Sequence, residues 1–160
     1  MYMARLHPAP LRQPREAQAR SPSASAASGS RLELEGVRVA IVEDDPDSRE
    51  LLAAIFEAAG ADVSSAPSAA EGFELVAATS PQLLVSDIAM PDEDGYSLMR
   101  RVRAAELAGT ALPAIALTAF GDEQARRRAL GAGFSLHMCK PVDAAAIIAA
   151  AKRLTRSLAS

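Results

Sequence analysis

The stretch VRVAIVEDDP, residues 37–46, runs from an apolar strand pattern directly into three acidic residues and a proline. Its β-branched and apolar part, Val37–Val42, predicts a buried strand. Asp45 before Pro46 is typical of a helix start, since the carboxylate accepts from free helical N–H groups and proline fits the first turn. The stretch therefore predicts a strand and a helix joined by a turn that carries Glu43 and Asp44.

The same alternation continues along the chain. We expect further strands over residues 61–65, 82–86, 113–117 and 134–139, and helices over residues 46–59, 68–79, 96–106, 122–130 and from 143 onward. Ser68 and Glu71 form a capping-box pattern, and Asp122 and Asp143 stand where later helices need caps. Near-continuous apolar strands between helices predict an α/β fold with a doubly wound five-stranded parallel sheet and five helices.

Three of these helices carry apolar stripes at a spacing of three or four residues, which we expect to face the sheet. The stripes are Leu51, Ile55 and Ala58, then Leu98, Val102 and Ala105, then Ile147, Ala151, Leu154 and Leu158. The single cysteine, Cys139, ends the fifth predicted strand and is interpreted as a small buried apolar residue.

Composition indicates one folded domain and a different N-terminal segment. The chain has 160 residues, 49% of them hydrophobic, which is material for one domain with a full-sized core. Residues 1–35 are rich in Pro, Ser and Ala and lack apolar periodicity, so we expect a disordered tail or linker, with the folded domain at residues 36–158. Five Arg against Glu16 alone give residues 1–31 a charge of +4, which leaves −7 for residues 32–160. As an alternative to a plain disordered tail, these arginines could contact an acidic partner or nucleic acid.

The chain shows neither a disulfide pair nor a long apolar run. One cysteine cannot form an internal disulfide, and the longest apolar stretch, Ala144–Ala151, is too short to cross a bilayer. We therefore expect a cytoplasmic protein without membrane contact.

Reactive residues follow four of the predicted strands. These residues are Glu43 and Asp44, then Asp87, then Thr118, then Lys140. Parallel strands place their carboxyl ends on one edge of a sheet, so three acids, a hydroxyl and an ammonium group are expected to converge. Three carboxylates together can bind a hard cation such as Mg²⁺, and the ammonium group can neutralise charge on phosphoryl oxygens. The pattern predicts a phosphoryl-accepting magnesium site.

Four segments together resemble the receiver domain of two-component response regulators. They are VAIVEDDP at residues 39–46, LVSDIAMPDEDG at residues 84–95, the pair Thr118-Ala119 and the pair Lys140-Pro141. The resemblance covers about residues 36–157 and implies a flavodoxin-like sheet with strand order 2-1-3-4-5.

The resemblance also implies a role for each matching residue. Asp87 matches the phosphorylated aspartate, and Asp44, Asp87 and the backbone carbonyl of Ala89 match the direct Mg²⁺ ligands. Glu43 matches the second acidic position, which reaches the metal through water. Thr118 and Lys140 match the hydroxyl and ammonium groups that hold phosphoryl oxygens.

Three positions are unusual for the family. His137 stands where an aromatic switch residue that works with Thr118 is common, and we expect ordinary packing of a half-buried edge-strand histidine. Ala89 and Phe120 occupy the positions that flank the path of the hydrolytic water, where polar groups are common. A methyl group and a phenyl ring cannot orient water by hydrogen bonds, so slow self-dephosphorylation is expected.

The expected function is that of a signalling domain rather than an enzyme: a self-catalysed phosphoryl acceptor. The partners implied are a histidine kinase or histidine phosphotransfer protein and a downstream protein target, with a phosphorylation-dependent dimer as a further expectation. We expect no DNA-binding domain in cis. The main alternative is the receiver fragment of a hybrid sensor kinase. A flavodoxin-like cofactor binder is more remote, because three acids in the turn after the first strand repel phosphate.

Overall fold

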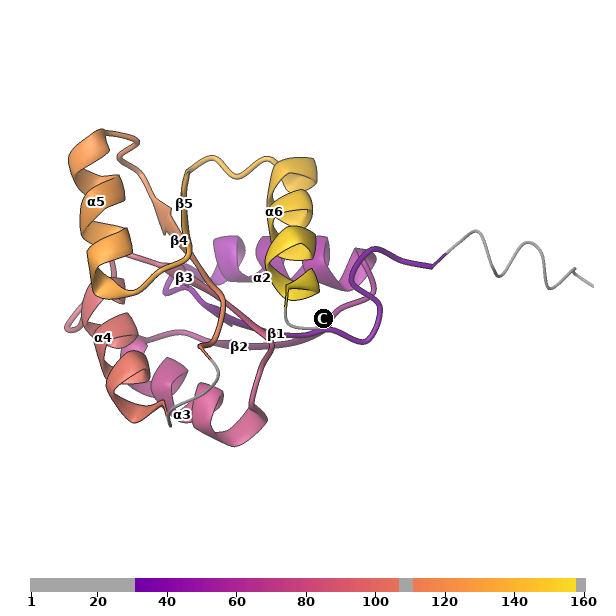
Figure 1. Cartoon of the computed structure of the whole chain (residues 1–160), viewed down its shortest axis with the longest axis horizontal. Coiled ribbons are helices and arrows are strands. Elements are labelled where there is room, and N and C mark those ends of the chain that lie inside the picture. Colours follow the sequence, from indigo (N-terminus) through magenta and orange to yellow (C-terminus); the bar gives the residue numbers. More distant parts are fainter. Residues whose placement is uncertain (1–30, 107–110, 158–160) are drawn as a thin grey trace, which may run out of the picture. The chain divides into compact units, whose positions relative to one another are not determined.

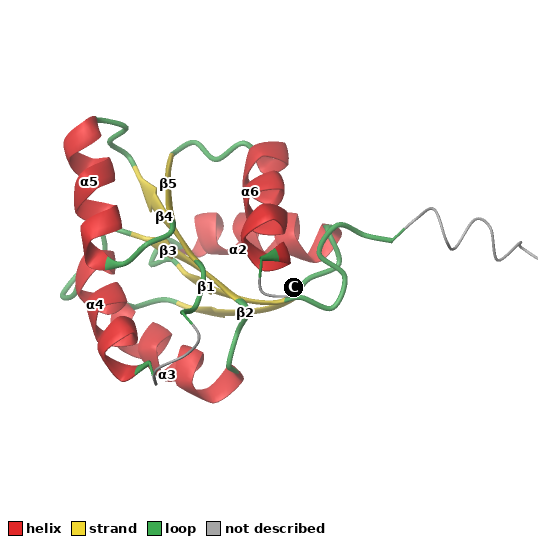
Figure 2. Ribbon diagram, viewed as in Figure 1, coloured by secondary structure: helices red, strands yellow, loops and turns green. Residues whose placement is uncertain are grey.

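The computed structural model describes residues 31–106 and 111–157 (Figures 1 and 2). In this part of the chain five strands alternate with five helices. The strands are β1 (Arg38–Val42), β2 (Asp62–Ala66), β3 (Leu83–Asp87), β4 (Ala114–Thr118) and β5 (Leu136–Cys139). The helices are α2 (Pro46–Ala58), α3 (Ala69–Thr79), α4 (Gly95–Ala105), α5 (Glu123–Ala132) and α6 (Ala144–Arg156). Most of the tail predicted for residues 1–35, and Leu158 of the last stripe, lie outside the described residues.

The five strands form one parallel sheet in the order β2-β1-β3-β4-β5. Helices α2 and α6 cover one face, and α3, α4 and α5 cover the other (Figure 1). This arrangement confirms the predicted flavodoxin-like, doubly wound fold. Among the described residues, no helix combines the length and the apolar character that crossing a bilayer requires.

Two apolar layers hold the helices against the sheet. The layer under α2 and α6 contains Ile41, Phe56, Val85 and Ile147, and the layer on the other face is built around Leu84 and its neighbours. Residues of β3 and β4 are buried on both faces because the strands lie in the middle of the sheet. The sheet therefore provides a rigid support for the loops at its carboxyl edge.

Side-chain caps start the helices as the sequence predicted. The carboxylate of Asp45 accepts from the Ser48 N–H at 2.9 Å, and the Ser68 hydroxyl accepts from the Glu71 N–H at 3.2 Å. The caps of α5 and α6 are Asp122 and Asp143. Asp94 caps α4 in the same manner, so that α4 begins at Gly95, one residue before the predicted start.

The stripe predicted for α2 is wrong at Leu51 and Ala58, which are exposed, whereas Ile55 packs against the core as predicted. Leu52 and Phe56 are buried on the sheet, with Leu52 only 4% exposed, whereas Leu51 is 62% exposed. Leu51 and Leu52 each begin an apolar i, i+4 pair, so periodicity alone does not choose between them. Phe56 has the larger apolar side chain, and its burial sets the rotation of the helix. On α4, Ala105 is likewise exposed, while Leu98 and Val102 are buried as predicted.

Two further expectations differ from the structure. Leu34 is fully buried in the layer under α2, so the packed unit begins before residue 36. Its N–H also donates to the Ala59 carbonyl at 2.8 Å, which ties this segment to the end of α2. Cys139 is exposed rather than buried, because it is the last residue of an edge strand.

We expect the Leu52→Ala variant to lose about 2–5 kcal/mol of unfolding free energy, because truncating a buried leucine removes apolar contacts and leaves a cavity. The matched Leu51→Ala variant should change it by no more than about 0.5 kcal/mol, since that side chain is mostly in water. Urea unfolding followed by circular dichroism measures both values. Equal losses in the two variants would contradict the observed rotation of α2.

Candidate functional site

The strand register brings the predicted site residues to one edge of the sheet. Val42 pairs with Ser86, so Glu43 stands level with Asp87 at the ends of β1 and β3. Thr118 ends β4 and pairs with Cys139, and Lys140 follows directly. The Lys140 N–H donates to the Thr118 carbonyl at 2.8 Å, which fixes the first residue beyond β5.

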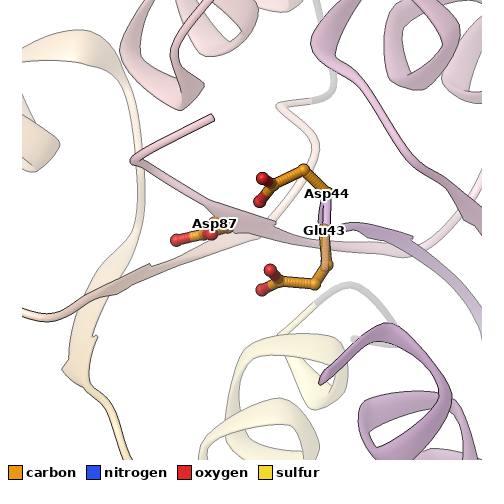
Figure 3. Close-up of side chains that lie close together, drawn as sticks. All are labelled: Glu43, Asp44 and Asp87. Carbon is orange, nitrogen blue, oxygen red and sulfur yellow. The ribbon is translucent and has the colours of Figure 1, made fainter. Parts of the chain in front are cut away.

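Three carboxylates meet at this edge. One oxygen each from Glu43, Asp44 and Asp87 lie within 4.8 Å of one another. The side chains of Glu43 and Asp44 extend from the end of β1 toward Asp87 (Figure 3). Glu43 is 1% exposed and Asp87 5% exposed, whereas Asp44 is only half-buried. Buried like charges repel strongly at such distances, so the cluster requires a compensating cation.

Lys140 supplies part of that compensation. Its Nζ lies 2.9 Å from Glu43 Oε2 and 3.2 Å from Asp87 Oδ2. Burial raises the pKa of Glu43 above its usual range, and the charge of Asp87 adds to this rise although Lys140 opposes it. Burial alone would lower the pKa of Lys140, but the contacts with Glu43 and Asp87 outweigh it and raise this pKa. The ammonium group is therefore held in its charged form beside Asp87.

The donor set also fits a hard divalent cation. Carboxylate oxygens from three acids converge, and Mg²⁺ prefers oxygen ligands while keeping several waters. Ala89, whose backbone carbonyl was predicted as a ligand, lies two residues beyond β3 and is exposed. No basic side chain other than Lys140 forms an ion pair with the three acids among the described residues.

Thr118 is connected to the following loop through Phe120. The Phe120 N–H donates to Thr118 Oγ1 at 3.1 Å, which leaves the hydroxyl proton of Thr118 available to another acceptor. His137 Nε2 lies 3.2 Å from the carbonyl oxygen of the same residue, Phe120. The half-buried His137 thus connects β5 to the loop after β4.

A pocket of about 360 Å³ opens beside Thr118, between the loops that follow β3 and β4. Ala89 and Phe120 are among the residues that line it, and Phe120 is 70% exposed. Both positions predicted to flank a hydrolytic water therefore face a shared space. Neither side chain carries a hydrogen-bonding group.

Sequence reasoning missed two features of the site. It assigned Lys140 to phosphoryl oxygens but did not foresee the direct pairing with Glu43. It also missed Arg49, whose Nη1 donates to the Glu43 carbonyl at 2.9 Å. The available signal for Arg49 was a basic residue near a helix N-terminus, where the helix dipole disfavours positive charge.

Comparison with known proteins identifies one family. The family model described as "Response regulator receiver domain" matches residues 39–152. A solved structure of a putative response regulator from Chloroflexus aurantiacus shares 30% sequence identity and a TM-score of 0.71, covering 76% of this chain and 99% of that one. The signal receiver domain of a histidine kinase from Syntrophus aciditrophicus shares 30% sequence identity and a TM-score of 0.69, covering 76% of this chain and 92% of that one.

Curated relatives differ in their overall organisation. A 14.6 kDa protein of Leptolyngbya boryana is 50% identical over 66% of this chain and 79% of its own length. The transcriptional regulator RpaA of Synechocystis is 30% identical over 74% of this chain, which spans only 49% of that regulator. Hybrid signal transduction histidine kinase D of Dictyostelium discoideum is 31% identical over 69% of this chain and 8% of the kinase.

We expect the Asp44→Asn variant, measured in a chelator, to be about 1 kcal/mol more stable than the wild type, because it removes one of three repelling carboxylates. Added Mg²⁺ should stabilise the wild type and have little effect on the variant. Urea unfolding with chelator and with saturating Mg²⁺ tests both statements. Asp47→Asn, an exposed acid on the first turn of α2, is the control and should keep the Mg²⁺ effect.

Proposed function

The chain belongs to the response regulator receiver domain family, and we propose that it accepts a phosphoryl group on Asp87 from a histidine kinase or a histidine phosphotransfer protein. The observation that carries this proposal is the position of Asp87: a buried carboxylate at a strand end, beside two further acids and 3.2 Å from Lys140 Nζ. Phosphoryl transfer needs a positioned nucleophile and cationic charge more than further covalent chemistry.

In the proposed reaction, a carboxylate oxygen of Asp87 attacks phosphorus in line with the phosphorus–nitrogen bond of phosphohistidine. A phosphorus–oxygen bond forms, the bond to nitrogen breaks, and the histidine leaves with the electron pair. Asp44, Asp87 and the Ala89 carbonyl would hold Mg²⁺, with Glu43 reaching it through water, and the ion would offset charge on the phosphoryl oxygens. The protein acts as acceptor in its own modification, as a signalling domain rather than a classical enzyme.

Two other side chains complete the proposed acceptor site. Lys140 lies against Asp87 already and needs only a small movement of its flexible stem to reach a phosphoryl oxygen. Thr118 accepts from the Phe120 N–H and so has its hydroxyl proton free to donate to a second phosphoryl oxygen. Both groups are available in the resting arrangement.

We propose that the signal is read on the surface of α5, β5 and α6, by a downstream protein target. Thr118 and Lys140 stand at the ends of β4 and β5, so engaging a phosphate biases the loops that lead into α5 and α6. The bond between His137 and the Phe120 carbonyl gives His137 a part in this switch. The exposed Arg126, Arg127 and Arg128 on α5 are the groups that an acidic partner would contact, although Arg126 and Arg127 pair with Glu123 in this structure. A phosphorylation-dependent dimer on this surface stays a prediction.

The relatives contain receiver domains in two kinds of protein, response regulators and hybrid kinases. Similar domains stand in regulators such as RpaA and in a hybrid kinase, so a receiver cut from a hybrid sensor kinase is the second candidate. The output and a cytoplasmic location stay predictions. A cofactor-binding flavodoxin-like function is disfavoured, because Glu43, Asp44 and Asp45 occupy the turn that would cradle an anionic phosphate.

We expect acetyl phosphate with Mg²⁺ to add one phosphoryl group to the wild type, detected by intact mass, and none to the Asp87→Asn variant. Asp92→Asn is the matched control: Asp92 is an exposed acid in the same loop, and its positive φ of 70° is one that asparagine tolerates. This control should label like the wild type. Equal labelling of the Asp87→Asn variant would rule out the assignment.

We also propose that the phosphoryl group persists, because Ala89 and Phe120 offer no hydrogen bond to an attacking water. The double variant with Ala89→Asn and Phe120→Glu should shorten the half-life of the phosphorylated protein by roughly 10²-fold. Decay of the phosphorylated form after removal of the phosphodonor measures this.

Gln124→Glu, which adds a carboxylate to the lining of the same pocket, is the control and should leave the rate unchanged. An unaltered half-life in the double variant, or rapid decay in the wild type, would contradict the proposal.

A further inference from the structure

Arg49 bonds to the main chain that carries two of the three site acids. It is the fourth residue of α2, and its half-buried side chain turns back toward the loop after β1. Its Nη1 donates to the Glu43 carbonyl at 2.9 Å and to the Asp44 carbonyl at 3.5 Å. The first distance is that of a strong hydrogen bond, and the second is a weaker contact.

These two carbonyls belong to the peptide groups on either side of Asp44. One group joins Glu43 to Asp44, and the other joins Asp44 to Asp45. Holding both peptide planes restricts φ and ψ of Asp44, and these angles determine the direction in which its side chain leaves the backbone. Asp44 is half-buried, and no group among the described residues donates a hydrogen bond to its carboxylate, so the direction of this side chain depends on the backbone.

The location of Arg49 is electrostatically unfavourable for the helix itself. A cation near the N-terminus of a helix opposes the helix dipole. The backbone N–H of Arg49 makes the first helical bond, to the Asp45 carbonyl at 2.9 Å, so its stem starts within the first turns of α2. A compensating gain is therefore expected, and the bonds to the Glu43 and Asp44 carbonyls supply one.

We propose that Arg49 is a positioning residue: its guanidinium group holds the Glu43–Asp44 backbone so that the acids are preorganised for Mg²⁺. This inference rests on the proposed function, since it concerns the same metal site. Partners that orient metal ligands typically change metal affinity by 10–100-fold when they are removed.

A purely electrostatic role for Arg49 predicts the opposite sign. A nearby cation repels Mg²⁺, so its removal would tighten metal binding. Lysine keeps the positive charge of Arg49 but lacks the planar guanidinium group with its several N–H donors. Glutamine keeps part of the length and polarity of the side chain without the charge. Arg49→Lys and Arg49→Gln together therefore separate positioning from charge.

Arg38 offers a matched control for both substitutions. It lies at the start of β1, and its Nε and Nη2 donate to the Ser80 carbonyl at 3.2 and 3.1 Å. This guanidinium–carbonyl interaction is at the opposite end of β1 from the acids. Arg38→Lys and Arg38→Gln should cost similar stability without affecting the metal site.

The experiment is a Mg²⁺ titration by calorimetry on the full chain. We expect both Arg49 variants to bind Mg²⁺ about tenfold more weakly than the wild type, and both Arg38 variants to bind it equally well. In labelling with acetyl phosphate, the half-saturating Mg²⁺ concentration should rise by the same factor in the Arg49 variants, with the final extent of labelling unchanged. Urea unfolding in chelator compares the stability of all four variants.

Unchanged Mg²⁺ affinity in both Arg49 variants overturns the inference, and tighter binding by Arg49→Gln overturns it in favour of charge alone. Either result leaves the proposed function intact if Asp87 of the wild type is labelled. A wild type that neither binds Mg²⁺ nor becomes labelled overturns both the inference and the proposed function.

Discussion

Repulsion among three carboxylates at the carboxyl edge of the sheet is the constraint on which the site depends. Glu43 and Asp87 are almost fully buried, and Asp44 lies close to both. Such a cluster costs free energy unless cations approach it. Lys140 reaches Glu43 and Asp87, and the remaining negative charge suits a divalent cation. The folded chain is therefore least stable when the site holds no metal. The same negative charge favours binding of the divalent cation that the proposed reaction needs.

The fold supplies the rigidity that such a cluster requires. Glu43 and Lys140 stand far apart in the sequence, yet both extend from strands packed between two apolar layers. Because the strands are parallel, their ends form one edge, and loops there can vary without disturbing the core. The arrangement separates stability, which resides in the layers, from chemistry, which resides in the loops.

The loop after β4 connects Thr118 of the proposed acceptor site to β5. Both backbone polar groups of Phe120 are engaged, its N–H with Thr118 and its carbonyl with His137. A movement of Thr118 therefore disturbs an interaction with β5 even though His137 is not the large aromatic residue common in this family. In the proposed switch, this hydrogen bond stands where family members commonly have an aromatic side chain.

Local patterns in the sequence were enough to predict the alternation of strands and helices, the caps and the location of reactive residues after the strands. Asp45, Ser68, Asp122 and Asp143 cap their helices for reasons that lie within four residues of each. Strand order entered through the resemblance to receiver domains, and the structure confirms it.

Periodicity did not reveal whether Leu51 or Leu52 faces the sheet, since both suit the helical period. Packing in three dimensions buries Phe56 and with it Leu52. It also decided that Leu34 joins the core, that Lys140 pairs with Glu43 and that Arg49 holds the backbone beside Asp44. Burial and the pairing of distant residues depend on which surfaces meet in space. Local sequence patterns do not contain that information.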